Sequence, residues 1–149
     1  MNMKRLATVL ATVGGLFVLY IGISYLLAPQ TTAEGFGLPT WPQDEGKGFL
    51  FVKGIRDIGF GLVIFALLLA GQRRALGLTM AATAFVPAGD MVLVLSEGGS
   101  AATAYGVHGL TALAVAVTGA LLLRERPEAS ASTQIEHTPA APQHRVMAG

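Results

Sequence analysis

The residues best able to do chemistry lie at positions 53–57, within an apolar run from residue 48 to residue 70. Residues three and four positions apart share one face of a helix, so Lys53, Arg56 and Asp57 are expected to be neighbours. The run is long enough to cross a bilayer as a helix. Charged side chains at that depth are costly, need partners and often mark a functional site. The segment therefore predicts a polar site inside a membrane.

Composition also favours a membrane protein. Of the 149 residues, 52% are hydrophobic and 13% are charged, and the mean hydropathy is +0.58. These values are too apolar for an ordinary soluble domain. The chain has no cysteine, which excludes disulfides, thiolate metal sites and thiol redox chemistry. No basic patch or nucleic-acid motif occurs, so no nucleic-acid partner is expected.

Four apolar runs predict an all-α bundle of four transmembrane helices at about residues 6–27, 48–70, 75–96 and 102–123. Each has roughly the 20 residues that a helix needs to cross the hydrocarbon core. The first run is longer than a signal-peptide core and lacks a cleavage pattern, so we interpret it as an uncleaved span. Residues 1–126 are predicted to form the membrane domain. The polar stretch 127–149 is predicted to be a disordered cytoplasmic tail.

Lysine and arginine distribution predicts the orientation. Lys4 and Arg5 precede the first predicted span, and Arg73 and Arg74 lie between the second and the third. Arg124 and Arg126 follow the fourth. The connections 28–46 and 97–101 have none. Since basic loops stay in the cytoplasm, we expect a multi-pass protein of the cell membrane with both termini cytoplasmic.

Depth along the helices brings ionisable residues of three spans together. At about 1.5 Å of rise per residue, Lys53 lies roughly 8 Å and Asp57 roughly 14 Å below the outer boundary. Asp90 and His108 both lie about 9 Å below it. Lys53 can pair with Asp57, while Arg56 remains for Asp90 or for an anionic ligand. A shared polar cluster in the outer half of the membrane is therefore predicted.

Proline and glycine positions predict the surroundings of this cluster. Pro87 should interrupt its helix beside Asp90 and widen a cavity there. Glycines within the spans should let helices approach closely. The long connection from residue 29 to residue 47 carries Phe36 and Trp41, which either anchor it at the membrane interface or belong to a cap over the outer mouth.

Several of these elements resemble a family of uncharacterised small four-helix integral membrane proteins. The resemblance covers about residues 6–123. It is carried by Ala28-Pro29, Gly35-Phe36-Gly37-Leu38-Pro39, Lys53-Gly54-Ile55-Arg56-Asp57-Ile58, Pro87-Ala88-Gly89-Asp90 and His108. It implies a four-helix membrane protein and supports the polar residues chosen above. It implies no particular activity.

Three classes of function fit this pattern. The favoured one is binding of a small amphipathic or anionic molecule, or a transport-accessory role, with Lys53, Arg56, Asp57, Asp90 and His108 as ligand-binding residues. The second is an enzyme in which Asp57 or Asp90 is the general acid and His108 the base, in an isomerisation or cyclisation of a lipophilic substrate. The third is a scaffold whose ion pairs fix helix register, as an accessory subunit or homo-oligomer. Neither a cofactor nor a metal is expected, because the ligand spacing of a metal site is missing.

Overall fold

The fold begins at Asn2, whose side-chain oxygen accepts a hydrogen bond of 3.2 Å from the backbone nitrogen of Lys4. This bond caps α1, which runs over Met3–Leu27. The structure is a computed structural model that describes residues 2–125, and no β-strand occurs in that range. The predicted tail, 127–149, lies outside the described residues.

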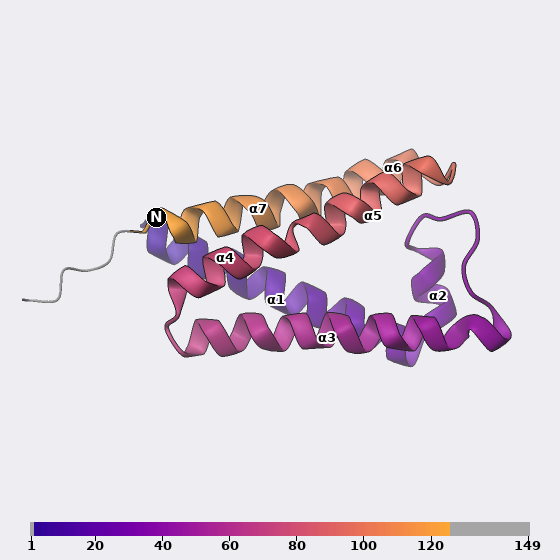
Figure 1. Cartoon of the computed structure of the whole chain (residues 1–149), viewed down its shortest axis with the longest axis horizontal. Coiled ribbons are helices and arrows are strands. Elements are labelled where there is room, and N and C mark those ends of the chain that lie inside the picture. The colour runs from indigo at the N-terminus through magenta and orange to yellow at the C-terminus, as the bar shows by residue number, and fades with distance from the viewer. Residues whose placement is uncertain (1, 126–149) are drawn as a thin grey trace, which may run out of the picture.

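Helices follow one another along the rest of the described chain (Figure 1). After α1 come α2 (Pro29–Glu34), the 3₁₀ turn η1 (Asp44–Lys47), α3 (Gly48–Leu69), α4 (Arg73–Thr83), α5 (Phe85–Ser96), α6 (Ala101–Thr103), the π-helical η2 (Ala104–Gly109) and α7 (Leu110–Leu123).

Three helical stretches are long and apolar enough to cross a membrane: Met3–Leu27, Arg73–Ser96 and Ala101–Leu123. They correspond to three of the four predicted spans. The helix α3 has 22 residues, but it carries the three charged side chains at positions 53, 56 and 57. The chain is therefore an all-helical protein, across residues 2–125, with three helices suited to a membrane.

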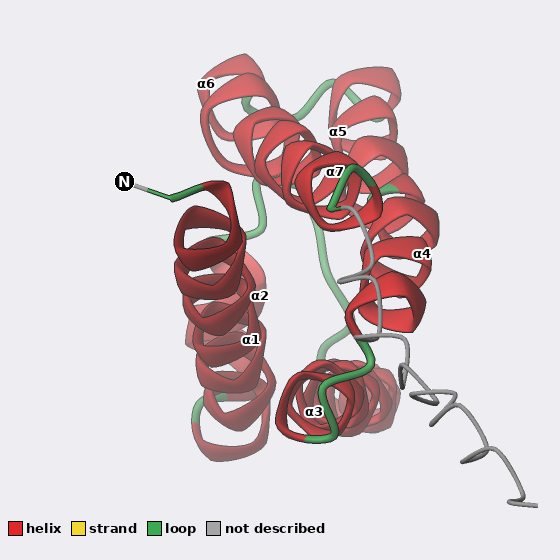
Figure 2. Cartoon of the chain, turned by 90° about the vertical axis from the view of Figure 1, so that its left-hand side faces the viewer, coloured by secondary structure: helices red, strands yellow, loops and turns green. Residues whose placement is uncertain are grey.

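Two helix pairs make up the bundle, because α1 packs along α3 and α4 packs along α7. Seen end-on, these four helices surround a common centre (Figure 2). Glycines hold each pair close. A Cβ on Gly54 would lie 2.8 Å from the backbone oxygen of Gly22, and a Cβ on Gly119 would lie 3.0 Å from that of Gly77. The predicted role of glycine in close helix approach is confirmed.

The helical stretch Arg73–Ser96 is interrupted near its proline, as the sequence predicts. Ala84 separates α4 from α5, and Pro87 is the third residue of α5. Proline has no N–H for the carbonyl of Thr83, four residues earlier, so the helix cannot continue regularly through this point. The predicted break beside Asp90 is confirmed.

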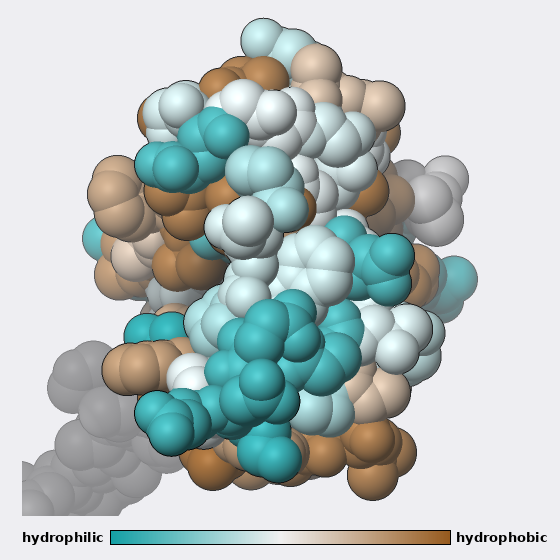
Figure 3. All heavy atoms as spheres, turned by 90° about the vertical axis from the view of Figure 1, so that its right-hand side faces the viewer, coloured by the Kyte–Doolittle hydropathy of each residue, from teal (hydrophilic) through white to brown (hydrophobic). Residues whose placement is uncertain are grey.

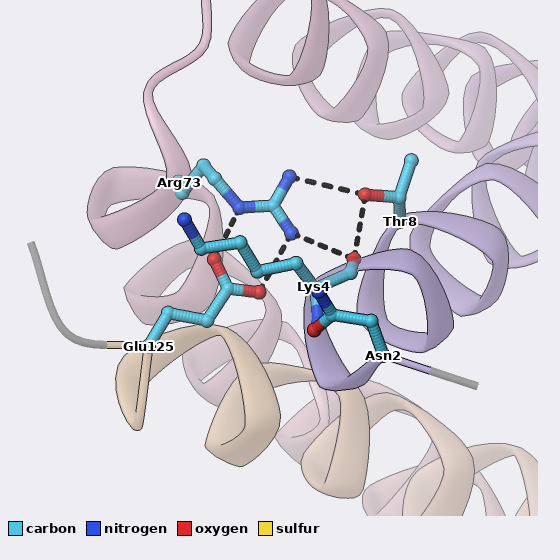
Figure 4. A network of polar contacts seen from close by, with 5 residues as sticks. All are labelled: Asn2, Lys4, Thr8, Arg73 and Glu125. Atoms are coloured by element: carbon cyan, nitrogen blue, oxygen red, sulfur yellow. Dashed lines mark hydrogen bonds and ion pairs between the residues drawn. The ribbon is translucent and has the colours of Figure 1, made fainter. Parts of the chain in front are cut away.

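One end of the bundle, here called the termini end, is joined by Arg73 at the start of α4 (Figure 4). Its guanidinium donates to both carboxylate oxygens of Glu125, at 2.7 Å for the Nη2–Oε1 bond. It also donates to Thr8 Oγ1 at 3.1 Å and to the backbone oxygen of Lys4 at 3.2 Å. The side chain of Glu125 is only 5% exposed. This clamp joins α1, α4 and the residues after α7.

The opposite end, here called the loop end, is covered by the connection between α2 and η1. The backbone nitrogen of Ser100 donates to the oxygen of Gly37 at 2.9 Å, and Trp41 Nε1 donates to Gln30 Oε1 at 2.9 Å. Gly37 has a φ of 97°, and a Cβ there would lie 2.8 Å from Thr103, so glycine is required. Hydrophilic side chains gather on this end face, and hydrophobic ones lie around its edges (Figure 3). The connection therefore caps the bundle.

Candidate functional site

A cavity of about 350 Å³ lies between the two helix pairs. At its loop end the wall is polar, with Tyr25, Lys53, Asp57, Asp90 and His108. Toward the termini end it is lined mainly by apolar groups, among them Leu10, Val13, Ile64, Met80 and Val115. The cavity thus has a charged head region and a hydrocarbon-like body.

Two threonines in the apolar part of the wall do not change its character. Thr83 donates to the backbone oxygen of Thr79 at 2.9 Å, and Thr118 donates to that of Ala114 at 2.7 Å. Each hydroxyl hydrogen is therefore used within its own helix. The polar groups left to interact with a ligand are those at the loop end and Thr111, three positions after His108, whose hydroxyl has no hydrogen bond within the described residues.

The Lys53 ammonium contacts three other residues in this head region. Its Nζ lies 2.6 Å from Asp57 Oδ2, which confirms the predicted pair one helical turn apart. The same ammonium lies 4.9 Å from the ring centre of Tyr25 and 5.8 Å from that of Phe36. Aromatic faces attract cations at such distances. A carboxylate and two rings therefore satisfy the Lys53 ammonium.

His108 is held in one orientation by the loop-end cap. Its Nε2 lies 2.8 Å from the backbone oxygen of Phe36, and the two rings are 4.5 Å apart. A carbonyl oxygen only accepts, so Nε2 is the nitrogen that carries hydrogen. The other nitrogen, Nδ1, lies 4.0 Å from Asp90 Oδ2, which is too long for a hydrogen bond. Asp90 and His108 are therefore close but not bonded.

The π-helix η2 brings His108 to this position. Residues 104–109 form a π-helical turn at the start of the last long helix, and His108 is buried in it. The wider turn shifts the side chains that follow relative to a regular helix, and such turns recur at functional sites. Nothing in the sequence indicated this π-helical turn, because the residues that form it are also compatible with a regular helix.

Arg56 does not join the cluster, contrary to the predicted contact with Asp90. It is exposed and outside the cavity wall, and it forms no ion pair or hydrogen bond within the described chain. Successive helical residues point about 100° apart. Because Gly54 faces α1 and Asp57 is buried, the rotation of α3 turns Arg56 outward. The structure brings together the other four predicted residues: Lys53, Asp57, Asp90 and His108.

A comparison with protein families covers most of this arrangement. A family model described as a domain of unknown function, DUF4267, matches residues 15–122. The chain belongs to this family. No curated protein and no solved structure matches the chain. The DUF4267 match supports the resemblance to an uncharacterised family and spans every charged residue of the cavity wall, but it assigns them no role.

The side of this DUF4267 chain is open between α3 and α5. The helix α3 packs on α4, and across residues 2–125 it has no comparable packing against α5. Phe60 on α3 and Val86 on α5 both line the cavity, and they are 38% and 43% exposed. The apolar part of the cavity therefore reaches the side surface of the bundle.

The charged residues do not form a metal centre in the part of the chain described here, since no group of three or more His, Cys, Asp or Glu side chains converges. The arrangement can instead pair an ammonium with a carboxylate, offer a second carboxylate, and present one nitrogen of an imidazole. Besides the π-helical turn, sequence reasoning missed the Phe36 carbonyl that orients His108 and the Arg73–Glu125 clamp. A backbone carbonyl has no sequence signal, and Arg73 was interpreted only as a marker of topology.

Proposed function

We propose that the protein is an integral membrane protein with four spans, both termini in the cytoplasm and the loop end outside. Three helices already have the length and hydropathy of spans. The fourth, α3, is about 33 Å long at 1.5 Å per residue, and it packs along α1. Two of its three charged side chains, Lys53 and Asp57, pair within the cavity wall, which lowers the cost of placing them in a membrane.

Reporter fusions test this topology. Reporters placed after Thr40 and after Gly99 are expected outside, and reporters after Arg74 and after residue 126 inside. A reversed signal at any one of these four points contradicts the arrangement.

Within this membrane protein, the cavity binds a small amphipathic molecule, either as a binding protein or as a transport accessory. The observation that carries this proposal is the division of one cavity into a charged head region and an apolar body. Its volume lies within the range of about 300–1,000 Å³ typical of ligand sites. The side opening at Phe60 and Val86 would let a ligand enter from the bilayer.

Binding of radiolabelled octanol tests the proposal. The protein is placed in nanodiscs of neutral phosphatidylcholine, and the signal of empty nanodiscs is subtracted. A leucine at Gly14, which lines the apolar body and where a Cβ would lie 3.8 Å from Met80, should fill the space and abolish binding. Gly59→Leu is the control, because nothing lies within 4 Å of a Cβ there. Octanol binding that is equal in both variants, or the absence of binding by octanol and by its charged analogues alike, contradicts the proposal.

Catalysis in the same cavity is a second candidate, favoured by the orientation of His108. With Nε2 donating to Phe36, only Nδ1 is available as a base, and it faces Asp90. An enzyme would convert a lipophile that a His108→Gln variant binds but leaves unchanged. Mass spectrometry of lipids from membranes that contain either form distinguishes the two candidates, since a binding protein yields identical lipids.

A further inference from the structure

The cavity wall has two carboxylates but only one ammonium among the described residues, and this difference indicates the class of ligand. The wall holds one lysine, two aspartates and one histidine. Lys53 and Asp57 neutralise each other at 2.6 Å. Arg56, the other cation of the segment, is exposed and does not line the cavity. The carboxylate that remains is Asp90.

Asp90 lacks a donor within the described residues. It forms no hydrogen bond there, and its side chain is 28% exposed at the cavity wall. His108 Nδ1 lies 4.0 Å from Asp90 Oδ2, and the charges of Lys53 and Asp57 also act on this carboxylate across the cavity. When the ring is neutral, Nε2 holds its hydrogen and Nδ1 presents a lone pair to this carboxylate, so only a protonated ring could donate to Asp90. A partly buried carboxylate without a donor is costly, so a cationic donor would stabilise it.

The neighbouring wall already accommodates an ammonium group. Lys53 Nζ lies between the carboxylate of Asp57 and the rings of Tyr25 and Phe36. An ammonium is therefore compatible with this part of the wall, whereas an anion would meet the Asp90 carboxylate and, among the described residues of the wall, a lysine already paired with Asp57. The apolar body offers room for a hydrocarbon chain in the direction of Leu10 and Met80.

We propose that the cavity selects a lipophilic amine, whose protonated head binds the Asp90 carboxylate at the loop end while its hydrocarbon chain occupies the apolar body. This inference rests on the proposed function and specifies the chemical class of its ligand. Of the amphipathic or anionic ligand expected from the sequence it keeps the amphipathic class, since of the two expected anchors Arg56 lies outside the cavity wall and Lys53 is paired with Asp57.

Three probes of equal chain length test this selectivity: octylamine, octanol and octanoate. Their binding is measured at neutral pH in the same phosphatidylcholine nanodiscs, with empty nanodiscs subtracted. Octylamine is expected to bind at least tenfold more tightly than octanol and octanoate. If octanol or octanoate binds as tightly as octylamine, the amine proposal fails and amphiphile binding stands. If none of the three binds, the proposed function itself fails.

Variants identify the residue responsible. Asp90→Asn should abolish the preference for octylamine over octanol, while Asp90→Glu should keep the preference. Asp44→Asn, in the exposed turn η1, is the matched control and should behave as the natural chain. A preference that survives Asp90→Asn overturns the proposal. Should Asp90→Asn fail to fold, Asp90→Glu and the three-probe comparison on the natural chain still decide.

His108→Gln tests the alternative in which a protonated His108 ring, rather than an amine, neutralises the Asp90 carboxylate. Glutamine cannot carry the charge, so in this variant no imidazolium can neutralise Asp90. Octylamine is expected to bind this variant at least as tightly as the natural chain. A loss of the preference for octylamine would instead assign the recognition to His108 and overturn the proposal.

Discussion

Replacing Asp57 by asparagine should lower stability far more than replacing Asp90 by asparagine. Asp57 is paired with Lys53 at 2.6 Å, and their side chains are 12% and 26% exposed. Removing one partner of a buried pair costs about 3–5 kcal/mol, and the partial exposure of Lys53 places Asp57→Asn near the lower value. Such a loss lowers the Tm of a domain of this size by roughly 10 °C. Asp90 has no hydrogen bond in the described chain, so Asp90→Asn should change stability by less than about 1 kcal/mol.

Thermal unfolding in a non-ionic detergent, followed by circular dichroism, measures both variants. A double replacement, Lys53→Met with Asp57→Leu, is the control, because apolar residues of similar size generally restore the stability lost with a buried pair. Equal losses of Tm in Asp57→Asn and Asp90→Asn would make Asp90 part of the scaffold and refute its assignment to a ligand. An unchanged Tm in Asp57→Asn would mean that the pair contributes little and that Lys53 is free to bind an anion.

Three further predictions concern the contact between α1 and α3, the Arg73–Glu125 clamp and the position of Arg56. Gly54→Ala should lower stability by about 1–2 kcal/mol, because a Cβ there would meet the Gly22 oxygen at 2.8 Å. Gly59→Ala, where a Cβ meets open space, should raise stability by up to about 1 kcal/mol. Equal melting temperatures of the two variants would contradict the close helix contact. Glu125→Gln should destabilise the bundle by about 3 kcal/mol by leaving Arg73 without its carboxylate, which chemical unfolding measures against the exposed Glu45→Gln as control. Arg56→Gln should leave octylamine binding unchanged, since Arg56 lies outside the cavity, and a fall of tenfold or more would return it to the site.

The positions of the helices and the identity of most cavity charges could be predicted from the sequence. Both depend on local properties: hydropathy over about 20 residues, and a fixed rise per residue that places Lys53, Asp90 and His108 at one level. Proline likewise predicts the break before Asp90, because the missing N–H is a property of the residue itself. These inferences need no knowledge of neighbouring helices.

The rotation of each helix about its own axis is different, because the partner helix determines it. The contact of Gly54 with Gly22 turns Asp57 toward the cavity and Arg56 outward, although the sequence places both within one turn. That single rotation removes Arg56 as a possible anchor for an anion and underlies the proposal of an amine.

Contacts between distant segments also depended on the tertiary structure. The Phe36 carbonyl reaches His108 across 72 positions, and Arg73 reaches Glu125 across 52. Hydropathy and periodicity describe neighbours along one helix, so they carry no information about such pairs. The sequence by itself determined which segments are apolar helices and which of them carry charge. Only packing decided which charges face one another, because that depends on side chains from several helices meeting in one place.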